Sequence, residues 1–196
     1  MTLHEPPTDP RTRRTLSLLE RAMGSLLETQ SISEINVSEL CRVAGIHRTT
    51  FYKHFSSVAE FAAYTFARLV DELSSVTDDD VPDAAEDVPE HYRRALVRML
   101  DHIAENRSVY RRLFASGGDH HFQRISADVL AQQAVEANSR LGDRGRGIDV
   151  DHETAARMVG AACAAALGVW SEQDETDSER RSREIMSLLP SWWHPR

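Results

Sequence analysis

The chain has 196 residues, of which 41% are hydrophobic and 28% are charged, and its formal net charge is −8 at pH 7. This length is enough to bury a substantial core, and the composition is ordinary for a globular chain. No window approaches the roughly 20 apolar residues of a membrane-spanning helix, and the first residues lack the basic and apolar regions of a signal peptide. We therefore expect a cytoplasmic protein with no membrane partner, in which Cys41 and Cys163 are reduced.

The predicted secondary structure begins with three helices close together in the chain. Apolar residues recur at a spacing of three and four nearly everywhere, which predicts an all-α fold class. The first helix is predicted from Arg13 to Glu28, the second from Val37 to about Ala44, and the third from Arg48 to His54. These three helices form the predicted N-terminal helix-turn-helix head.

Local signals mark the ends of these helices. Asn36 precedes Glu39 by three residues and Ser57 precedes Glu60 by the same spacing. Both pairs fit a capping box, in which each side chain binds a free backbone N–H at the start of a helix. Gly45 can adopt the left-handed conformation that ends a helix. A turn is therefore expected between the second and third helices, and a longer helix is expected after Ser57.

The remainder of the chain is predicted to be a helical body. The segment from Ser74 to Pro89 is rich in Asp, Ser and Pro and has no apolar period, so it is predicted to be a surface linker. Glycines at 117–118 and within 142–147 predict loops. Apolar stripes predict helices around Tyr92 to Ile103, Val109 to Phe114, Phe122 to Leu130, Glu153 to Trp170 and Ser178 to Leu189.

Basic side chains are concentrated near the N-terminus. Residues 1–56 carry seven basic and six acidic side chains, whereas the remaining residues carry sixteen and twenty-five. Affinity for DNA depends on neutralising phosphates with Lys and Arg. The clusters at Arg11–Arg14 and Arg48–Lys53 therefore favour a nucleic-acid partner in spite of the acidic total. The cluster Arg11–Arg14 has two interpretations, a solvated basic tail and an arm that reaches the DNA.

A short helix, a turn containing Gly and a second short helix, packed under a preceding amphipathic helix, form the layout of a DNA-reading helix-turn-helix. The stretch from Val43 to Phe55 resembles the turn and recognition helix of the TetR/AcrR family of transcriptional regulators. The resemblance covers about residues 12–60, and beyond it only the order and lengths of the helices agree. The matching positions are Ala44, Gly45, Ile46, Phe51, Tyr52, His54 and Phe55.

The residue types of this motif indicate two faces. Ile46, Phe51 and Phe55 are expected to face inward against Leu16, Leu19 and Leu40. The outward face offers hydroxyls, ring N–H groups and cations to phosphates and base edges, with Tyr52 and Lys53 on phosphates and Thr49 and Thr50 near bases. The N-terminus of the helix after Ser57 is a further predicted phosphate-binding site. The predicted DNA-binding residues are Arg14, Asn36, His47, Arg48, Thr49, Thr50, Tyr52, Lys53, His54 and Ser57.

The resemblance implies a division of the chain into a DNA-binding domain, residues 1–57 with its basic arm, and a regulatory and dimerisation domain, residues 58–196. The Ala- and Gly-rich helix around Glu153–Trp170 and the apolar face of Ser178–Leu189 suit a homodimer interface. The body is expected to bind a small, largely apolar effector of unknown identity. The predicted pocket residues are His102, Tyr110, Phe114, Phe122, Cys163 and Trp170.

The predicted function is a ligand-responsive repressor that binds a palindromic operator in double-stranded DNA as a dimer. An enzyme is disfavoured, because no nucleophile elbow, phosphate loop or dinucleotide fingerprint is present. No cofactor is expected, and the histidines of the body lack the spacing of a metal site. The alternative is a TetR-like coactivator or partner-binding protein that has lost operator binding, because His47 and Val58 replace the Ser or Thr and the Lys common in the family.

Overall fold

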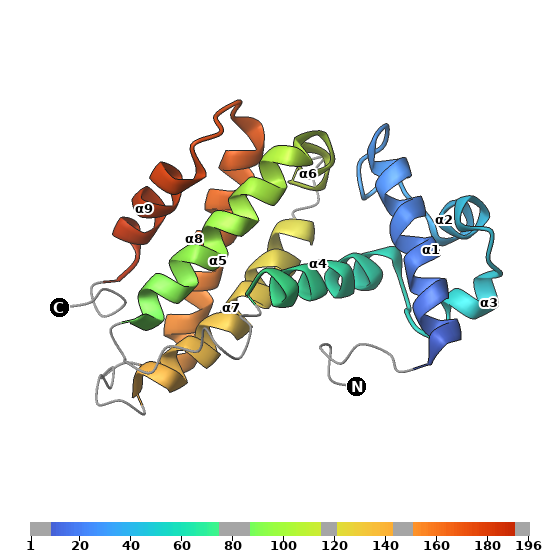
Figure 1. Ribbon diagram of the computed structural model, residues 1–196. Helices are drawn as coiled ribbons and strands as arrows, with labels where there is room; N and C mark the ends of the chain where they lie inside the picture. The colour runs from blue at the N-terminus through green and yellow to red at the C-terminus, as the bar shows by residue number, and fades with distance from the viewer. Residues whose placement is uncertain (1–8, 75–86, 115–120, 143–150, 191–196) are drawn as a thin grey trace.

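The computed structural model describes residues 9–74, 87–114, 121–142 and 151–190, and the regular elements in these ranges are α-helices. Helices α1 to α3 form a head, α4 leads away from the head, and α5 to α9 form a body beside it (Figure 1). The predicted all-α class is confirmed, as is the order of a helix-turn-helix head followed by a helical body. Within the described ranges, the structure has no helix long and apolar enough to cross a membrane.

Helix α1 spans Pro10–Leu27 and begins three residues before the predicted start. The side chain of Asp9 accepts a hydrogen bond from the backbone N–H of Arg11 at 3.1 Å. Pro10 is the first helical residue, where its missing N–H costs nothing. The periodicity of apolar residues could not locate this start, because the first turn carries no buried side chain.

Helices α2, Val37–Ala44, and α3, Arg48–Phe51, complete the head. The second helix has its predicted bounds, but the third is shorter than the predicted Arg48–His54. Residues 52–54 form a turn instead, in which the N–H of His54 donates to the carbonyl of Phe51 at 2.9 Å.

Helix α4, Val58–Ser74, belongs to both the head and the body. Phe61 lies in the head core, while Phe66 and Val70 lie in the body core. Helix α5 spans Asp87–Glu105, so the predicted linker from 74 to 89 is wrong at both ends; its middle, 75–86, lies outside the described residues. Pro89 is tolerated in the first turn of α5, because a helix has no intrahelical partner for its first N–H groups.

The body also contains α6, Arg107–Phe114, α7, His121–Gly142, α8, His152–Glu172, and α9, Ser178–Leu188. Helix α7 is much longer than its predicted apolar stripe. It packs so closely on α8 that a Cβ at Gly160 would lie 2.5 Å from the backbone oxygen of Ala127. Helix α9 is held on α5 by an ion pair of 2.6 Å between Arg93 and Glu179. The loop predicted at 117–118 lies outside the described residues. The loop predicted at 142–147 is wrong at Gly142, which is the last residue of α7, and its remainder lies outside the described residues.

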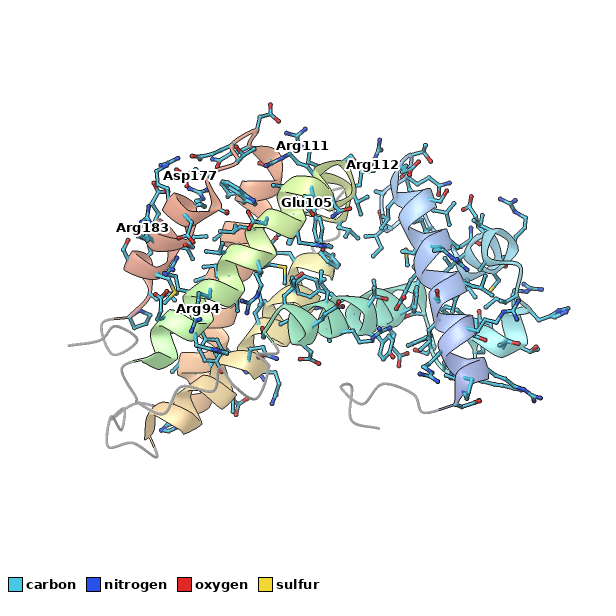
Figure 2. The ribbon with its side chains drawn as sticks, viewed as in Figure 1. Arg94, Glu105, Arg111, Arg112, Asp177 and Arg183 are labelled. Carbon is cyan, nitrogen blue, oxygen red and sulfur yellow. The ribbon has the colours of Figure 1, made fainter. Side chains whose placement is uncertain are left out.

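Arginines of α6 bind the C-terminal end of α8. Arg107 donates to the carbonyl of Trp170 at 2.6 Å, and Arg111 donates to the carbonyl of Ser171 at 2.9 Å. The carbonyl of Trp170 also accepts from the N–H of Gln173 at 3.2 Å. The guanidinium groups thus add donors at the end of a helix, where the last carbonyls lack an intrahelical partner. Arg111 is directed toward this end of the body, whereas Arg112 lies on the side that faces the head (Figure 2).

Candidate functional site

The turn between α2 and α3 is fixed by one glycine. Gly45 has φ +68° and ψ +31°, and its N–H donates to the carbonyls of Arg42 and Cys41. The N–H of Ile46 also donates to the carbonyl of Cys41, at 3.0 Å. A side chain at position 45 would strain this left-handed backbone. The sequence therefore sets the angle between the two short helices locally.

The inward face of the turn packs into the head core as predicted. Phe51 is fully buried and Phe55 nearly so, in one apolar cluster with Leu16, Leu19 and Leu40. Ile46 is partly buried against the same cluster. Phe51 and Phe55 have ring centroids 5.7 Å apart, and both rings also contact Phe61 at the start of α4. The aromatic cluster holds α3 at a fixed position relative to α4.

The predicted DNA-binding residues lie on the surface. Tyr52 is 58% exposed, an unusual fraction for an aromatic residue at the end of a buried turn. Thr50, His54 and Ser57 are half-buried. The other members of the predicted set that are exposed are Arg14, Asn36, His47, Arg48, Thr49 and Lys53.

Two of these residues also cap helices. The side chain of Asn36 accepts from the N–H of Glu39 at 3.0 Å, and that of Ser57 accepts from the N–H of Glu60 at 3.1 Å. In a capping box, Glu39 and Glu60 would also accept from the backbone N–H groups of Asn36 and Ser57. The two glutamates form other bonds. Glu39 instead accepts from Gln30, and Glu60 accepts from the N–H and hydroxyl of Ser56. A carboxylate therefore already lies beside the N-terminus of α4.

A groove of about 650 Å³ connects these features on one side of the head. It lies between the N-termini of α2 and α4, and Asn36, Tyr52 and Ser57 are among its lining residues. Arg48 donates from Nη1 to the hydroxyl of Ser38 at 3.1 Å, which ties α3 to α2 beside the groove. The groove thus presents two helix N-termini, several hydroxyls and an exposed phenol, the groups that bind phosphate in DNA.

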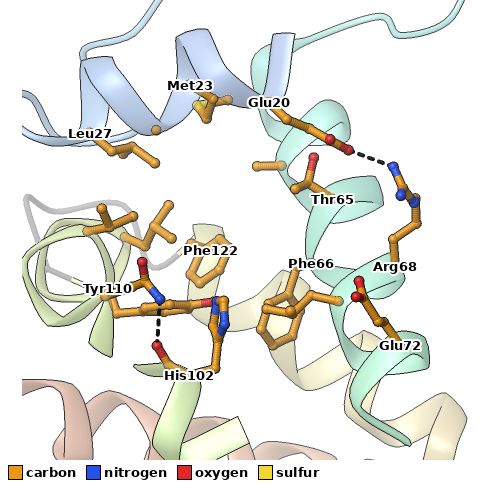
Figure 3. Close-up of a pocket in the computed structure, with 16 residues that line it drawn as sticks. Glu20, Met23, Leu27, Thr65, Phe66, Arg68, Glu72, His102, Tyr110 and Phe122 are labelled. Atoms are coloured by element: carbon orange, nitrogen blue, oxygen red, sulfur yellow. Dashed lines mark hydrogen bonds and ion pairs between the residues drawn. The ribbon is translucent and has the colours of Figure 1, made fainter. Parts of the chain in front are cut away.

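A separate cavity of about 350 Å³ lies between α1, α4 and helices α5 to α7 (Figure 3). Three of the predicted pocket residues, His102, Tyr110 and Phe122, line it. The rings of His102 and Tyr110 are in edge contact, with centroids 5.7 Å apart. Burial raises the pKa of the Tyr110 hydroxyl well above its usual range and lowers the pKa of His102 below 6.5.

The other three predicted pocket residues lie elsewhere. Phe114 packs behind Phe122, with ring centroids 5.1 Å apart. Trp170 is fully buried, and its Nε1 donates to the carbonyl of Leu100 at 2.9 Å. Cys163 lines a second, apolar cavity of only about 80 Å³ between α4, α5, α7, α8 and α9.

The cavity also receives residues that the sequence did not point to. Helix α1 supplies Glu20, Met23 and Leu27, and α4 supplies Arg68 and Glu72. Gly24 is a local signal of this cavity in the sequence, because it is a glycine inside an amphipathic helix. In the structure, a Cβ placed at Gly24 would meet no atom within 4 Å. The contribution of the first helix to a cavity of the body depends on tertiary packing and leaves no other trace in the sequence.

Neither cysteine has the environment of a reactive thiol. Burial raises the pKa of Cys41 and raises that of Cys163 to about 11. A thiol with a raised pKa carries little thiolate at neutral pH, so it is a poor nucleophile. Among the described residues, no group of three or more His, Cys, Asp and Glu side chains could hold a metal ion.

Comparisons with known proteins agree with this architecture. No protein-family model matches the chain. The activator of the dhaKLM operon from Lactococcus lactis, DhaS, is 22% identical over 66% of this chain and 65% of its own length. The regulator EthR from Mycolicibacterium smegmatis is 33% identical over 49% of this chain and 41% of its own length. The chain thus spans less than two thirds of each of these curated relatives.

Solved structures share the fold over nearly the whole chain. A Rhodococcus protein assigned to the TetR family of transcriptional regulators superposes with a TM-score of 0.62 at 16% identity, over 91% of this chain and 97% of that one. The described helices thus define an all-α helix-turn-helix protein with a helical body. The fold is that of the TetR-family transcriptional regulators, and the resemblance seen in the helix-turn-helix motif is confirmed at this level.

Proposed function

We propose that the protein is a DNA-binding transcriptional regulator that acts as a ligand-responsive repressor in the cytoplasm. The observation that carries the proposal is the exposed face of α3 and its following turn, held rigidly by the Gly45 turn and the aromatic cluster beneath it. In this proposal residues 1–57 are the DNA-binding domain and residues 58–196 are the regulatory and dimerisation domain. The curated relatives that the chain resembles are named as regulators of transcription.

The proposed contacts follow from exposure and chemistry. Tyr52 and Lys53 are exposed at the end of α3 and bind phosphates, while Thr49 and Thr50 reach base edges in the major groove. Arg48 is oriented by its bond to Ser38 and is available to a neighbouring phosphate. Glu60 is negatively charged and lies beside the start of α4, so it weakens phosphate binding at this helix N-terminus.

A homodimer is proposed from the exposed apolar side chains of the last two helices. Met158 is 62% exposed and Val169 is 46% exposed, and together with Ala161, Ala162 and Ala165 they follow one stripe of α8. Leu188 of α9 is 85% exposed. Apolar side chains of this size rarely stay in water in such a group. A two-fold dimer would present two recognition helices to a palindromic operator.

The dimer is tested by light scattering at micromolar concentration. Ala162→Arg should give monomers with weakened DNA binding, because a buried unpaired guanidinium is costly at an apolar interface. Ala162→Ser is the matched control and should remain dimeric. A wild-type protein with the mass of a monomer would exclude the proposed interface.

DNA binding is tested by selecting bound duplexes from a random library and then measuring affinity against salt. Lys53→Ala should weaken all duplexes about equally and reduce the salt slope by about one unit per subunit, since each phosphate contact releases about one counterion. Thr49→Ala should instead change the preferred sequence. The effector is expected to weaken operator binding, and the operator to weaken effector binding, by the same factor.

The alternative is a TetR-like coactivator or partner-binding protein without operator binding. The observation that favours it is the N-terminus of α3, where His47 makes no side-chain capping bond. A protein that retains no duplex from the library at low salt would support this alternative, because a working head should bind DNA nonspecifically under those conditions.

A further inference from the structure

The 350 Å³ cavity has one wall in the head and another in the body. The head wall is the face of α1 that carries Met23 and Leu27 (Figure 3). The body wall includes Tyr110 of α6 and Phe122 of α7. Leu113 of α6 also lines the cavity and packs against both the head core and the body core. A molecule in this cavity would therefore touch the DNA-binding head and the body at the same time.

The inner wall of the cavity is aromatic. Phe66 and Phe122 are in edge contact, with ring centroids 5.5 Å apart. Phe114 supports this wall from behind, because its ring is stacked on that of Tyr110 and is in edge contact with that of Phe122. Aromatic surfaces of this kind bind other rings through edge and offset contacts. A volume of 350 Å³ is near the lower end of the range for ligand pockets, so it suits a flat molecule of about one or two fused rings.

The charged side chains of the lining are already engaged within the protein. The carboxylate of Glu20 and the guanidinium of Arg68 form an ion pair at 2.6 Å that joins α1 to α4 (Figure 3). Glu72 also interacts with another group of the protein. An organic anion would have to displace Glu20 from Arg68, and an organic cation would have to displace Arg68 from Glu20. An ion that loses its hydration without gaining a partner is strongly disfavoured. The lining therefore favours an uncharged molecule.

Two uncharged polar groups lie beside each other on the body wall. His102 and Tyr110 both line the cavity, and their ring centroids are 5.7 Å apart. Burial lowers the pKa of His102, so its imidazole is mostly neutral near pH 7, and burial raises the pKa of the Tyr110 hydroxyl, which stays protonated. Thr65 and Asn106 of the lining donate instead to the backbone carbonyls of Phe61 and His102. The Tyr110 phenol can thus donate a hydrogen bond to a ligand without bringing a charge.

We propose that this cavity binds a small uncharged aromatic alcohol. Its rings lie against Phe66 and Phe122 and against the apolar face of α1, and its oxygen accepts a hydrogen bond from the Tyr110 hydroxyl. This inference deepens the proposed function by giving the chemical class and the place of the effector, and its regulatory part rests on that function. Because the ligand touches α1 as well as α6 and α7, it favours one position of the head relative to the body.

The first experiment is titration of the full-length protein with four probes that share one ring system, followed by the fluorescence of the naphthalene ring. The probes are naphthylmethanol, methylnaphthalene, naphthylmethylamine and naphthoate. The alcohol should bind about tenfold more tightly than the amine and the naphthoate, since either ion loses hydration without a free counter-charge. It should bind about fivefold more tightly than methylnaphthalene, through one hydrogen bond. An ion that binds as tightly as the alcohol, or no binding of any probe, would overturn the proposal.

Charge variants test whether the ion pair excludes ionic ligands. Arg68→Met leaves Glu20 without its guanidinium, so it should raise the affinity for the amine relative to the alcohol about fivefold. Glu20→Gln should raise the relative affinity for the naphthoate in the same way. Arg157→Met is the matched control, because Arg157 is paired with Glu153 at 3.0 Å on the exposed face of α8 and does not line the cavity. Unchanged preferences in both cavity variants, or an equal change in the control, would overturn the selection of an uncharged ligand.

Removal of one hydroxyl tests the hydrogen bond. Tyr110→Phe should abolish the preference for naphthylmethanol over methylnaphthalene and leave the affinity for methylnaphthalene unchanged. Tyr64→Phe is the matched control, because Tyr64 is a buried tyrosine of the head core that does not line the cavity, and it should keep the preference. A folded Tyr110→Phe protein with the full preference would show that Tyr110 is not the donor.

A filling variant tests the place of binding. Gly24 lines the cavity and has open space around its Cβ position. Gly24→Leu should abolish binding of the alcohol by occupying the space, while Gly24→Ala should preserve it. Both variants should fold, because either side chain is more favourable than Gly inside a helix. Undiminished binding of the alcohol by a folded Gly24→Leu protein would place the probe elsewhere.

The last step distinguishes this proposal from the proposed function. Naphthylmethanol is titrated into the free protein and into its complex with a duplex from the random library. DNA binding without probe binding would overturn the cavity proposal alone, and probe binding without DNA binding would overturn the proposed function alone. Equal affinity of the alcohol for both forms would remove the regulatory part, because only a ligand that prefers one state shifts the equilibrium.

Discussion

The head and the body of this protein are held together by interactions of different range. In the head, the side-chain hydrogen bonds of Asn36, Arg48 and Ser57 join residues three to ten positions apart in the chain. In the body, Trp170 bonds to a residue 70 positions away and Arg93 to one 86 positions away. A site built from local interactions can be recognised in a single sequence, whereas a site built from distant ones depends on how the helices pack.

The strongest test of this contrast is a matched pair of glycine substitutions in α8. Gly160→Ala should cost about 3 kcal/mol, because its Cβ would lie 2.5 Å from the backbone of α7, which cannot move aside. Gly168→Ala should be neutral or slightly stabilising, because its Cβ would lie 3.4 Å from the ring of Phe114. Thermal unfolding measures both. Equal effects of the two changes would mean that the distance between α7 and α8 is not the constraint.

The next largest effect is expected at Trp170, which joins α8 to α5. Trp170→Phe should lower the free energy of unfolding by about 2 kcal/mol, since it leaves a cavity and removes the bond to the carbonyl of Leu100. Urea titration measures the loss. An unchanged free energy of unfolding would show that the indole and its bond to Leu100 do not hold α8 against α5.

A smaller effect is expected in the head. Gly45→Ala should cost about 1 kcal/mol, because an L-residue is disfavoured at φ +68°. DNA affinity should fall as well, since the angle between α2 and α3 depends on this turn. Gly24→Ala in α1 is the control, with ordinary helical backbone, and should stabilise the protein by up to about 1 kcal/mol. The comparison is made by thermal unfolding and DNA titration. A destabilised protein with full DNA affinity would show that the turn at Gly45 does not control the position of the recognition face.

The smallest effect is a pH dependence. Burial lowers the pKa of His102 in the folded state below its ordinary value of 6.5, so the unfolded chain binds this proton more readily. The free energy of unfolding should therefore fall as the pH decreases below 6.5, through the folded-state pKa. His102→Gln removes this contribution, so the variant should lose less stability than the wild type as the pH is lowered. Denaturant titrations on both sides of this pH measure the difference. Identical pH profiles would show that the imidazole is not desolvated.

The sequence by itself determined the head and the fold class. Asn36, Gly45 and the aromatic residues after it act through their immediate neighbours, so their spacing predicted α2, the turn and the buried face of α3. The start of α1 and the partners of two glutamates were not predicted from the sequence. Asp9 and Pro10 start α1 before any apolar residue, and Glu39 and Glu60 find partners other than the capping residues.

Only the tertiary structure decided which residues share the larger cavity. His102, Tyr110 and Phe122 were expected together from the order of the helices, but Cys163 lines another cavity and Trp170 belongs to the core. The meeting of Glu20 with Arg68, 48 residues further along, depends on the angle at which α4 leaves the head. That angle is set by the sum of many apolar contacts, which are nondirectional, so no short pattern of residues encodes it.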